Sequence, residues 1–267
     1  MAGPQKTVSL TPGLRALLDT TSERWLINAV EGWQAEDTAG NRRDPGWFHP
    51  SDLSHTCDAY LAFAFLGAPK RKDTDPRKRR VLDNGLSRDA DWKRYLRESG
   101  LSIVPRGVGA DCPGCGWKNA DGRHICIPEV RVRGEFDDLV QNQYTKEHRI
   151  FEFKTKNDNL WKKLTAPDPD HIVQVQPYMV ARALINTDIV YENKDNQELK
   201  AFTIAFDREL WQSTIERIQR IIDMLANGYS PDRVPEPFET SCTFYPICAT
   251  SHFPDMVERY KQERGIA

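Results

Sequence analysis

Two stretches of the chain alternate apolar and polar residues, as strands with one buried face do. They cover residues 130–140 and 149–153, and a polar segment separates them, which predicts a β-hairpin. Side chains two apart on a strand share a face, so Glu152 and Lys154 are expected to project together. Asp137 is expected to meet them from the neighbouring strand, whereas Asp138 alternates to the opposite face.

Apolar residues at helical spacing predict the helices. Thr11 and Pro12 resemble an N-cap and first helical position, and the leucines and tryptophans that continue to Trp33 are expected to lie in the core. Ser51 can cap a second helix. The predicted helices after the first cover 52–66, 83–101, 170–184 and 208–227, and two further strands cover 188–191 and 199–206. Pro177 is expected to kink the helix at 170–184.

The hairpin brings together residue types that support phosphodiester chemistry. Carboxylates such as Asp137 and Glu152 suit a hard divalent cation, magnesium or manganese. Lys154 would orient an attacking water or stabilise developing charge. A simpler interpretation stays open, in which Glu152 and Lys154 form an exposed cross-strand ion pair.

Four residues in a glycine-rich stretch have the spacing of a zinc site. Cys112, Cys115, His124 and Cys126 form C-x2-C-x8-H-x-C, which can close a structural tetrahedral zinc knuckle. The alternatives are a reduced hairpin without metal and a redox CxxC pair, in which His124 and Cys126 would have no role.

Positive charge is densest in the run KRKDTDPRKRR at residues 70–80. This run is interpreted either as a solvated, mobile loop or as a phosphate-contacting patch. A second basic and aromatic stretch follows the hairpin, where Trp161 could either border a DNA groove or simply pack. The candidate DNA-binding residues are Lys70, Arg71, Lys72, Arg77, Lys78, Arg79, Arg80, Lys156 and Trp161.

Length and composition limit the class of protein. The 267 residues can bury a full core, and the net charge of −2 excludes a generally basic nucleic-acid coat, so DNA contacts must come from local patches. No apolar run is long enough to span a bilayer, and the N-terminus does not resemble a secretory signal. A cytoplasmic location is expected, where the six cysteines stay reduced.

The order of these motifs resembles the PD-(D/E)XK nuclease superfamily, in particular its RecB-like exonuclease branch. The resemblance rests on Gly134-x-x-Asp137, then Glu152-x-Lys154, then Gln174-x-x-x-Tyr178. It implies that Asp137 and Glu152 hold magnesium or manganese, that Lys154 positions the attacking water, and that Gln174 and Tyr178 orient DNA or the metal-bound network. The family has a metal-binding histidine where this chain has Asp89, four residues after Gly85.

The cysteines near the two ends resemble those of iron-sulfur nucleases such as the CRISPR adaptation exonucleases and AddB. Cys57 matches the N-terminal cysteine, and Cys242 and Cys248 match two of the three C-terminal ones, but Glu239 replaces the first. Three interpretations stay open: an iron-sulfur cluster with an unusual fourth ligand, a zinc ion with His252 or His55, or a core without metal.

Together these features predict an α/β, restriction-endonuclease-like fold with a mixed central sheet flanked by helices. A helical segment at 1–50 would precede a nuclease domain at 51–267, with a zinc-knuckle insert at 109–127 and a cysteine-bearing strap at 230–252. The expected function is metal-dependent DNA exonuclease activity in recombination, repair or phage DNA processing, on ends or single strands, with a possible single-strand annealing or recombination partner protein. The alternatives are a catalytically weak DNA-binding accessory protein and a zinc-stabilised protein-interaction module.

Overall fold

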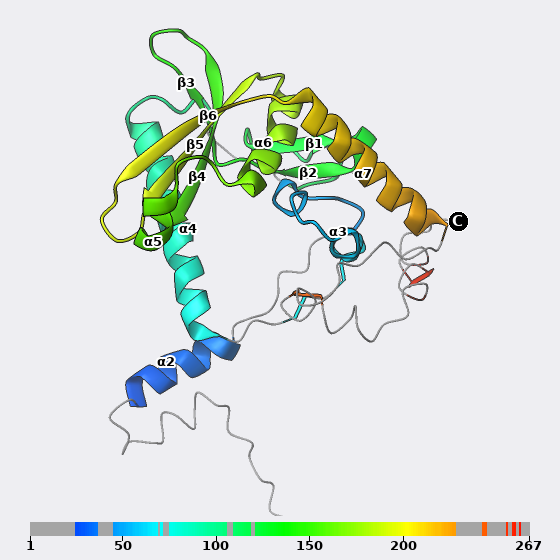
Figure 1. Ribbon diagram of the computed structural model, residues 1–267, viewed down its shortest axis with the longest axis horizontal. Helices are drawn as coiled ribbons and strands as arrows, with labels where there is room; N and C mark the ends of the chain where they lie inside the picture. Colours follow the sequence, from blue (N-terminus) through cyan, green and yellow to red (C-terminus); the bar gives the residue numbers. More distant parts are fainter. Residues whose placement is uncertain are drawn as a thin grey trace, which may run out of the picture.

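The computed structural model describes residues 25–36, 45–68, 70–71, 75–105, 109–118, 121–227 and 242–244, with the isolated positions 255, 258, 259 and 262. The chain forms a mixed α/β fold, as predicted (Figure 1). Its helices are α2 (Trp25–Glu36), α3 (Asp58–Phe65), α4 (Pro76–Glu98), α5 (Asp158–Lys163), α6 (Pro169–Arg182) and α7 (Arg208–Ala226), with 3-10 turns at Pro50–Asp52 and Pro128–Val130.

A four-stranded mixed sheet occupies the centre. Its order is β3 (Asp138–Gln141), β4 (His148–Lys156), β5 (Asn186–Asn193) and β6 (Leu199–Ala205). Only β4 and β5 run parallel, and β3 and β4 form the predicted antiparallel hairpin. A separate two-stranded sheet pairs β1 (His124–Ile127) with β2 (Val132–Glu135). The predicted strand pair at 188–191 and 199–206 is confirmed as β5 and β6.

The first strand of the predicted hairpin is broken in two. β2 pairs with β1 in one sheet, whereas β3 pairs with β4 in the other, and Phe136 and Asp137 lie between them. Phe136 is 1% exposed and packs edge-on against Tyr178 of α6. The chain therefore passes from one sheet to the other at the point where it supplies Asp137.

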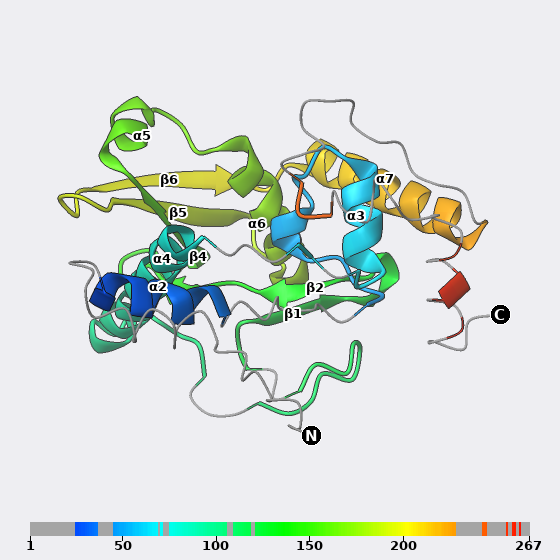
Figure 2. The ribbon, with the colours of Figure 1, turned by 90° about the horizontal axis from the view of Figure 1, so that it is seen from below.

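The two faces of β4 are covered by different helices. Phe151 and Phe153 pack against Trp92 of α4, with ring centroids 5.6 Å apart in both pairs. Ile150 on the other face joins the main core, which includes Val175 of α6. Figure 2 shows α4 and α5 on opposite sides of the four-stranded sheet. Side chains of alternate β4 residues thus point toward α4 and toward α6.

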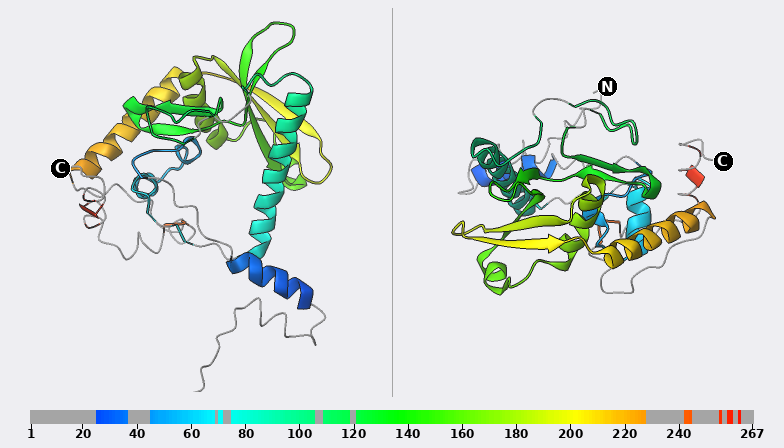
Figure 3. Two further views of the ribbon diagram at one scale, coloured as in Figure 1. Left: turned by 180° about the vertical axis from the view of Figure 1, so that it is seen from behind. Right: turned by 90° about the horizontal axis from the view of Figure 1, so that it is seen from above.

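The prediction that the first helix belongs to the core is wrong for the part that the structure describes. Leu26 and Trp33 of α2 are 58% and 61% exposed. The helix lies beside the beginning of α4, away from the sheet (Figure 3), and Arg80 donates hydrogen bonds to Gln34 and Glu31. Apolar periodicity predicted the helical part that the structure describes but not the surface that it leaves exposed, and the predicted N-cap at Thr11 and Pro12 lies outside the described residues.

Two helices have different limits from those predicted. Residues 52–57 are not α-helical, so Cys57 is the N-cap of α3 and His55 precedes it. α4 begins at Pro76, well before residue 83, because the Asp75 carboxylate caps it by accepting a hydrogen bond from Arg77 N at 2.9 Å. The second half of the basic run is therefore helical and not a loop. Within the described residues, no helix is long and apolar enough to cross a membrane.

Candidate active site

Glu152 and Lys154 lie on the same face of the central strand β4, as predicted. Lys154 Nζ donates a hydrogen bond to Glu152 Oε1 at 2.7 Å. Gln174 of α6 joins both groups, because its Nε2 donates to Glu152 Oε1 at 2.8 Å and its Oε1 accepts from Lys154 Nζ at 3.1 Å. Glu152 is only 2% exposed, so the interpretation as an exposed ion pair is wrong. Buried charges of this kind are costly to fold and mark a site.

Asp137 reaches the same place from the break between β2 and β3. Its Oδ2 accepts a hydrogen bond from Phe153 N at 2.7 Å, and its side chain lines a cavity of about 580 Å³ together with Glu152 and Lys154. Burial, followed by the nearby carboxylates of Glu152 and Asp89, raises the pKa of Asp137 to about 8. Crowded carboxylates that resist ionisation are characteristic of a site that receives a cation.

Asp138 faces away from this cavity, as the alternation predicted. It is 3% exposed and accepts a hydrogen bond from Ser102 Oγ at 2.7 Å. It lines a different cavity with Arg94, Arg97 and Arg123. The adjacent residues Asp137 and Asp138 therefore face two different cavities.

Asp89 projects from α4 into the cavity, one turn after Gly85, which also lines it. The predicted facing of these two residues is confirmed. Lys93, one turn further along α4, was not singled out from the sequence. Its Nζ lies 2.6 Å from Asp89 Oδ2 and 3.9 Å from Asp137 Oδ1. The i, i+4 spacing of Asp89 and Lys93 was the signal that could have found it.

Two oxygen atoms of the cavity could bind a divalent cation, although Asp89, Asp137 and Glu152 do not all bring their oxygens within 4.8 Å of one another. Glu152 Oε2 and Asp89 Oδ1 are both buried and, in the described part of the chain, have no hydrogen-bond partner. An unpaired buried carboxylate oxygen is destabilising unless a ligand satisfies it. Asp137 stands beside them, so Asp137, Glu152 and Asp89 are the residues that would hold such an ion.

Gln174 and Tyr178 share one face of α6 although Pro177 lies inside that helix. Gln174 Nε2 is 3.3 Å from Tyr178 Oη. Tyr178 is 3% exposed and, unlike Gln174, does not line the cavity. Tyr178 therefore supports Gln174 from behind, and the expectation that it orients DNA by contact does not fit its position.

His171, one turn before Gln174 on α6, also lines the cavity and was missed in the sequence. Its Nδ1 lies 2.7 Å from Tyr191 Oη, which itself accepts a hydrogen bond from Asp168 N. Tyr191 Oη and His171 Nδ1 share this hydrogen bond, and which of them donates depends on the imidazole tautomer. Burial, with a smaller contribution from Lys154, lowers the pKa of His171 to about 4. His171 is therefore neutral near pH 7.

The candidate DNA-binding residues are divided among different surroundings. Lys78 and Lys156 line the cavity, and Lys156 Nζ is paired with Asp168. Trp161 is 5% exposed, with Lys200 Nζ 4.6 Å from its ring centroid, so it packs in the core and does not border a groove. The others lie elsewhere. Arg79 pairs with Asp83, Arg80 pairs with Glu31, and Lys70 Nζ lies over the Tyr60 and Phe244 rings. Arg71 N donates a hydrogen bond to Thr243 O, Arg77 N donates one to the Asp75 carboxylate, and Lys72 lies outside the described residues.

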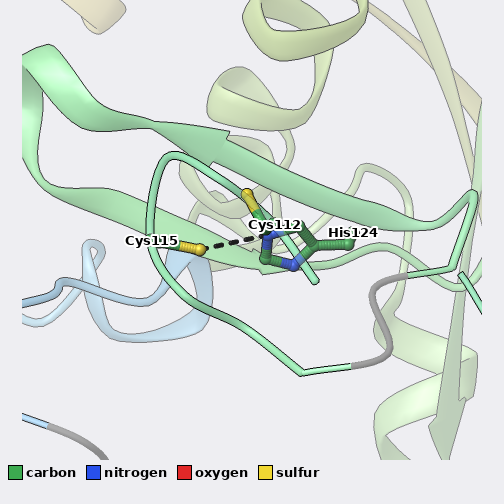
Figure 4. Close-up of side chains that lie close together, drawn as sticks. All are labelled: Cys112, Cys115 and His124. Carbon is green, nitrogen blue, oxygen red and sulfur yellow. Dashed lines mark hydrogen bonds between the residues drawn. The ribbon is translucent and has the colours of Figure 1, made fainter. Parts of the chain in front are cut away.

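Three of the four residues of the predicted zinc knuckle come together. Cys112, Cys115 and His124 bring their ligand atoms within 4.8 Å of one another, and among the described residues they are the only group of three or more that does so. Cys115 Sγ lies 3.3 Å from His124 Nε2 (Figure 4). A Cβ atom placed on Gly114 would lie 3.0 Å from Cys126 Sγ and 3.9 Å from Cys112 Sγ. Cys126 therefore borders the same space and can supply a fourth ligand.

The predicted zinc knuckle contacts both the strand that leads to Asp137 and the helix that carries Gln174. His124 and Cys126 lie on β1, which pairs with β2, the strand that leads to Asp137. Arg182 at the end of α6 donates hydrogen bonds to the carbonyls of Gly122 and His124, the latter at 3.1 Å. The same helix carries Gln174.

We expect the full chain to contain a zinc ion that Cys112→Ser or Cys126→Ser each removes, because a closed site loses affinity when any ligand is lost. Elemental analysis of the purified variants measures this. His148→Ala is the matched control, since His148 is exposed and contacts Gln141. Zinc retained in the Cys126 variant would contradict a four-ligand site.

The C-terminal cysteine site can be followed only in part. Cys57 and Cys242 both pack, partly buried, against the main core. Phe244 is fully buried against Tyr60 and Phe63, so residues 242–244 lie against α3. Glu239, Cys248 and His252 lie outside the described residues. An iron-sulfur or zinc site at these cysteines stays a prediction.

Comparisons with known proteins give likenesses of fold only. No family model and no curated protein matches the chain. The crystal structure of SSO0001 is 13% identical with a TM-score of 0.49, over 85% of this chain and 97% of that one. An alkaline exonuclease, LHK-Exo from Laribacter hongkongensis, is 17% identical with a TM-score of 0.43, over 74% and 93% of the two chains. LHK-Exo in complex with dAMP is 16% identical with a TM-score of 0.42, over 88% and 98%. Because these TM-scores are below 0.5, the chemistry must be argued from the cavity's own residues.

Proposed function

We propose that the chain is a metal-dependent DNA nuclease that hydrolyses phosphodiester bonds. The observation that carries this proposal is the buried network of Glu152, Lys154 and Gln174 beside Asp137, which leaves one Glu152 oxygen without a hydrogen-bond partner in the described structure. A magnesium or manganese ion held by Asp137 and Glu152, with Asp89 nearby, would polarise the phosphodiester and activate water.

Lys154 has the role of a fixed positive charge in this proposal. Burial disfavours its ammonium, but the Glu152 carboxylate outweighs burial and raises the pKa of Lys154 above its ordinary value. Lys154 therefore stays protonated at neutral pH and donates hydrogen bonds to an attacking water or to the charge that develops on the phosphate. It does not act as a general base.

Two neighbours complete the arrangement. Gln174 accepts from Lys154 and donates to Glu152, so it fixes both side chains in one geometry. Neutral His171 lines the cavity and, in the tautomer protonated on Nε2, would donate a hydrogen bond to a phosphate oxygen of a bound strand. Lys78 and Lys156 at the same cavity supply positive charge for the DNA backbone.

The finer features of the proposal follow the motif order. Gly134-x-x-Asp137, Glu152-x-Lys154 and Gln174-x-x-x-Tyr178 support membership of the RecB-like branch of PD-(D/E)XK nucleases, with exonuclease action on DNA ends or single strands. Recombination, repair or phage DNA processing in a bacterial or phage-infected cytoplasm, with an annealing or recombination partner, belongs to the same proposal. So does structural zinc in the knuckle.

One observation favours a second candidate, a DNA-binding accessory protein with weak catalysis. Lys93 Nζ already neutralises Asp89 and lies 3.9 Å from Asp137, so it competes with a cation for these carboxylates. This arrangement would reduce metal binding without removing the basic residues at the cavity.

A cleavage assay on linear duplex, closed circular and single-stranded DNA separates the two candidates. With magnesium or manganese we expect linear and single-stranded DNA to be degraded and the closed circle to persist, with no cleavage after chelation. Binding without cleavage in either metal would favour the accessory protein. Neither binding nor cleavage at low salt would exclude both.

A further inference from the structure

Lys93 places a positive charge between two acidic residues that come from different elements. Asp89 precedes it by one turn on α4, and Asp137 lies at the break between β2 and β3. Lys93 Nζ is 2.6 Å from Asp89 Oδ2 and 3.9 Å from Asp137 Oδ1. Its side chain is 19% exposed, so the ammonium is largely screened from solvent, beside the cavity that Asp89 and Asp137 line.

An ordinary i, i+4 ion pair does not explain this arrangement. Such pairs on an exposed helix stabilise by only about 0.3–0.5 kcal/mol and involve one carboxylate. Here the same ammonium is close to a second carboxylate across the cavity. A cation shared by carboxylates from two elements is the arrangement that a second divalent ion has in a two-metal site.

The charges of the cavity support the same conclusion. Asp89, Asp137 and Glu152 already face two ammonium groups, those of Lys93 and Lys154. Glu135 and three further lysines, Lys78, Lys156 and Lys194, also line the cavity, so ammonium groups match its carboxylates before any metal binds, and a second divalent ion would meet an excess of positive charge. Glu152 Oε2 and Asp89 Oδ1, which have no hydrogen-bond partner among the described residues, remain for a single ion together with the adjacent Asp137.

We propose that the Lys93 ammonium takes the place of a second divalent ion, so that the chain holds one catalytic ion and not two. This inference rests on the proposed function, because it concerns the same cavity. In this arrangement Asp89 holds Lys93 through Oδ2 and offers Oδ1 to the single ion, and Lys93 supplies charge near the phosphate without a second metal. Removing the lysine should free Asp89 and Asp137 to bind a second ion.

The test counts Mn²⁺ ions bound to the zinc-replete full chain, by electron paramagnetic resonance of free Mn²⁺ and by calorimetry. We expect one Mn²⁺ per chain in the wild type and two in Lys93→Met and Lys93→Gln. Arg94→Met is the matched control, since Arg94 is the next residue of α4 but pairs with Asp91 and Glu98 outside the cavity. It should bind one ion, as should the double variant Lys93→Met with Asp89→Asn.

Two Mn²⁺ ions in the wild type would overturn the proposal, because the ammonium would then yield to a metal. A single ion in both Lys93 variants, with unchanged circular dichroism, would overturn it as well. No bound Mn²⁺ in the wild type would overturn the proposed function itself. A wild type that cleaves DNA with two ions would leave the proposed function intact while excluding the lysine substitution, so the two failures are distinct.

Discussion

Replacing Glu152 with glutamine is expected to lower the rate of DNA cleavage by about a thousandfold or more, because the variant loses a metal-binding charge at the centre of the cavity. Glutamine keeps the shape of the side chain and can still accept from Lys154 and Gln174, which now bond to Glu152 Oε1. The fold should therefore persist. Single-turnover cleavage, circular dichroism and thermal unfolding of the same preparation measure both effects.

Glu147→Gln is the matched control, because Glu147 lies directly before β4 and pairs with Arg149 outside the cavity. It should cleave at the wild-type rate.

Lys154→Met should also abolish cleavage, but it leaves Glu152 as a buried, unpaired charge and should lower the free energy of unfolding by about 3–5 kcal/mol. Combining it with Glu152→Gln should restore much of that stability without restoring cleavage. Wild-type cleavage in folded Glu152→Gln would refute the site.

The second large effect is a dependence of metal affinity on pH. Asp137 must be ionised to bind a cation, and in the metal-free chain its pKa is about 8, because burial and the carboxylates of Glu152 and Asp89 oppose its charge. We expect the dissociation constant for Mn²⁺ to rise about tenfold for each pH unit below about pH 8 and to level off above it. Calorimetric titration across about pH 6 to 9 measures this.

The raised pKa of Asp137 also determines the direction in which the stability of the metal-free chain changes with pH. A carboxyl whose pKa rises from 3.8 to about 8 on folding stabilises the folded chain at low pH, fully below its ordinary value, and this stabilisation is lost as the pH rises through about 8. The metal-free chain should thus lose stability toward pH 8, and added Mn²⁺ should restore it. Asp137→Asn should remove this part of the pH dependence. A Mn²⁺ affinity independent of pH in the wild type would contradict the assignment.

Local patterns in the sequence were sufficient for the centre of the site. Alternation along β4 placed Glu152 and Lys154 together because a central strand between two neighbours keeps a regular pleat. Helical spacing did the same for Gln174 and Tyr178. The knuckle followed from cysteine spacing, because its ligands are close in sequence and β1 presents His124 and Cys126 on one face.

What the sequence did not predict depends on contacts between distant segments. The run at 130–140 alternates throughout, yet it changes sheets at Phe136, which is buried against Tyr178 of α6. Lys93 and His171 are ordinary helix residues until the fold brings Lys93 beside Asp137 and places His171 in the lining of the cavity. Trp161 lies in a basic and aromatic stretch of the kind that contacts DNA, but the fold buries its side chain.

The attachment of the knuckle to both β2 and α6 has a mechanical consequence. Arg182 holds the start of β1 against the end of α6, while β1 holds β2, so the knuckle braces the strand before Asp137 against the helix that carries Gln174. If the proposed zinc ion closes this loop, its removal should loosen the two supports relative to each other and so disturb the position of the Asp137 carboxylate beside the Glu152–Gln174 pair.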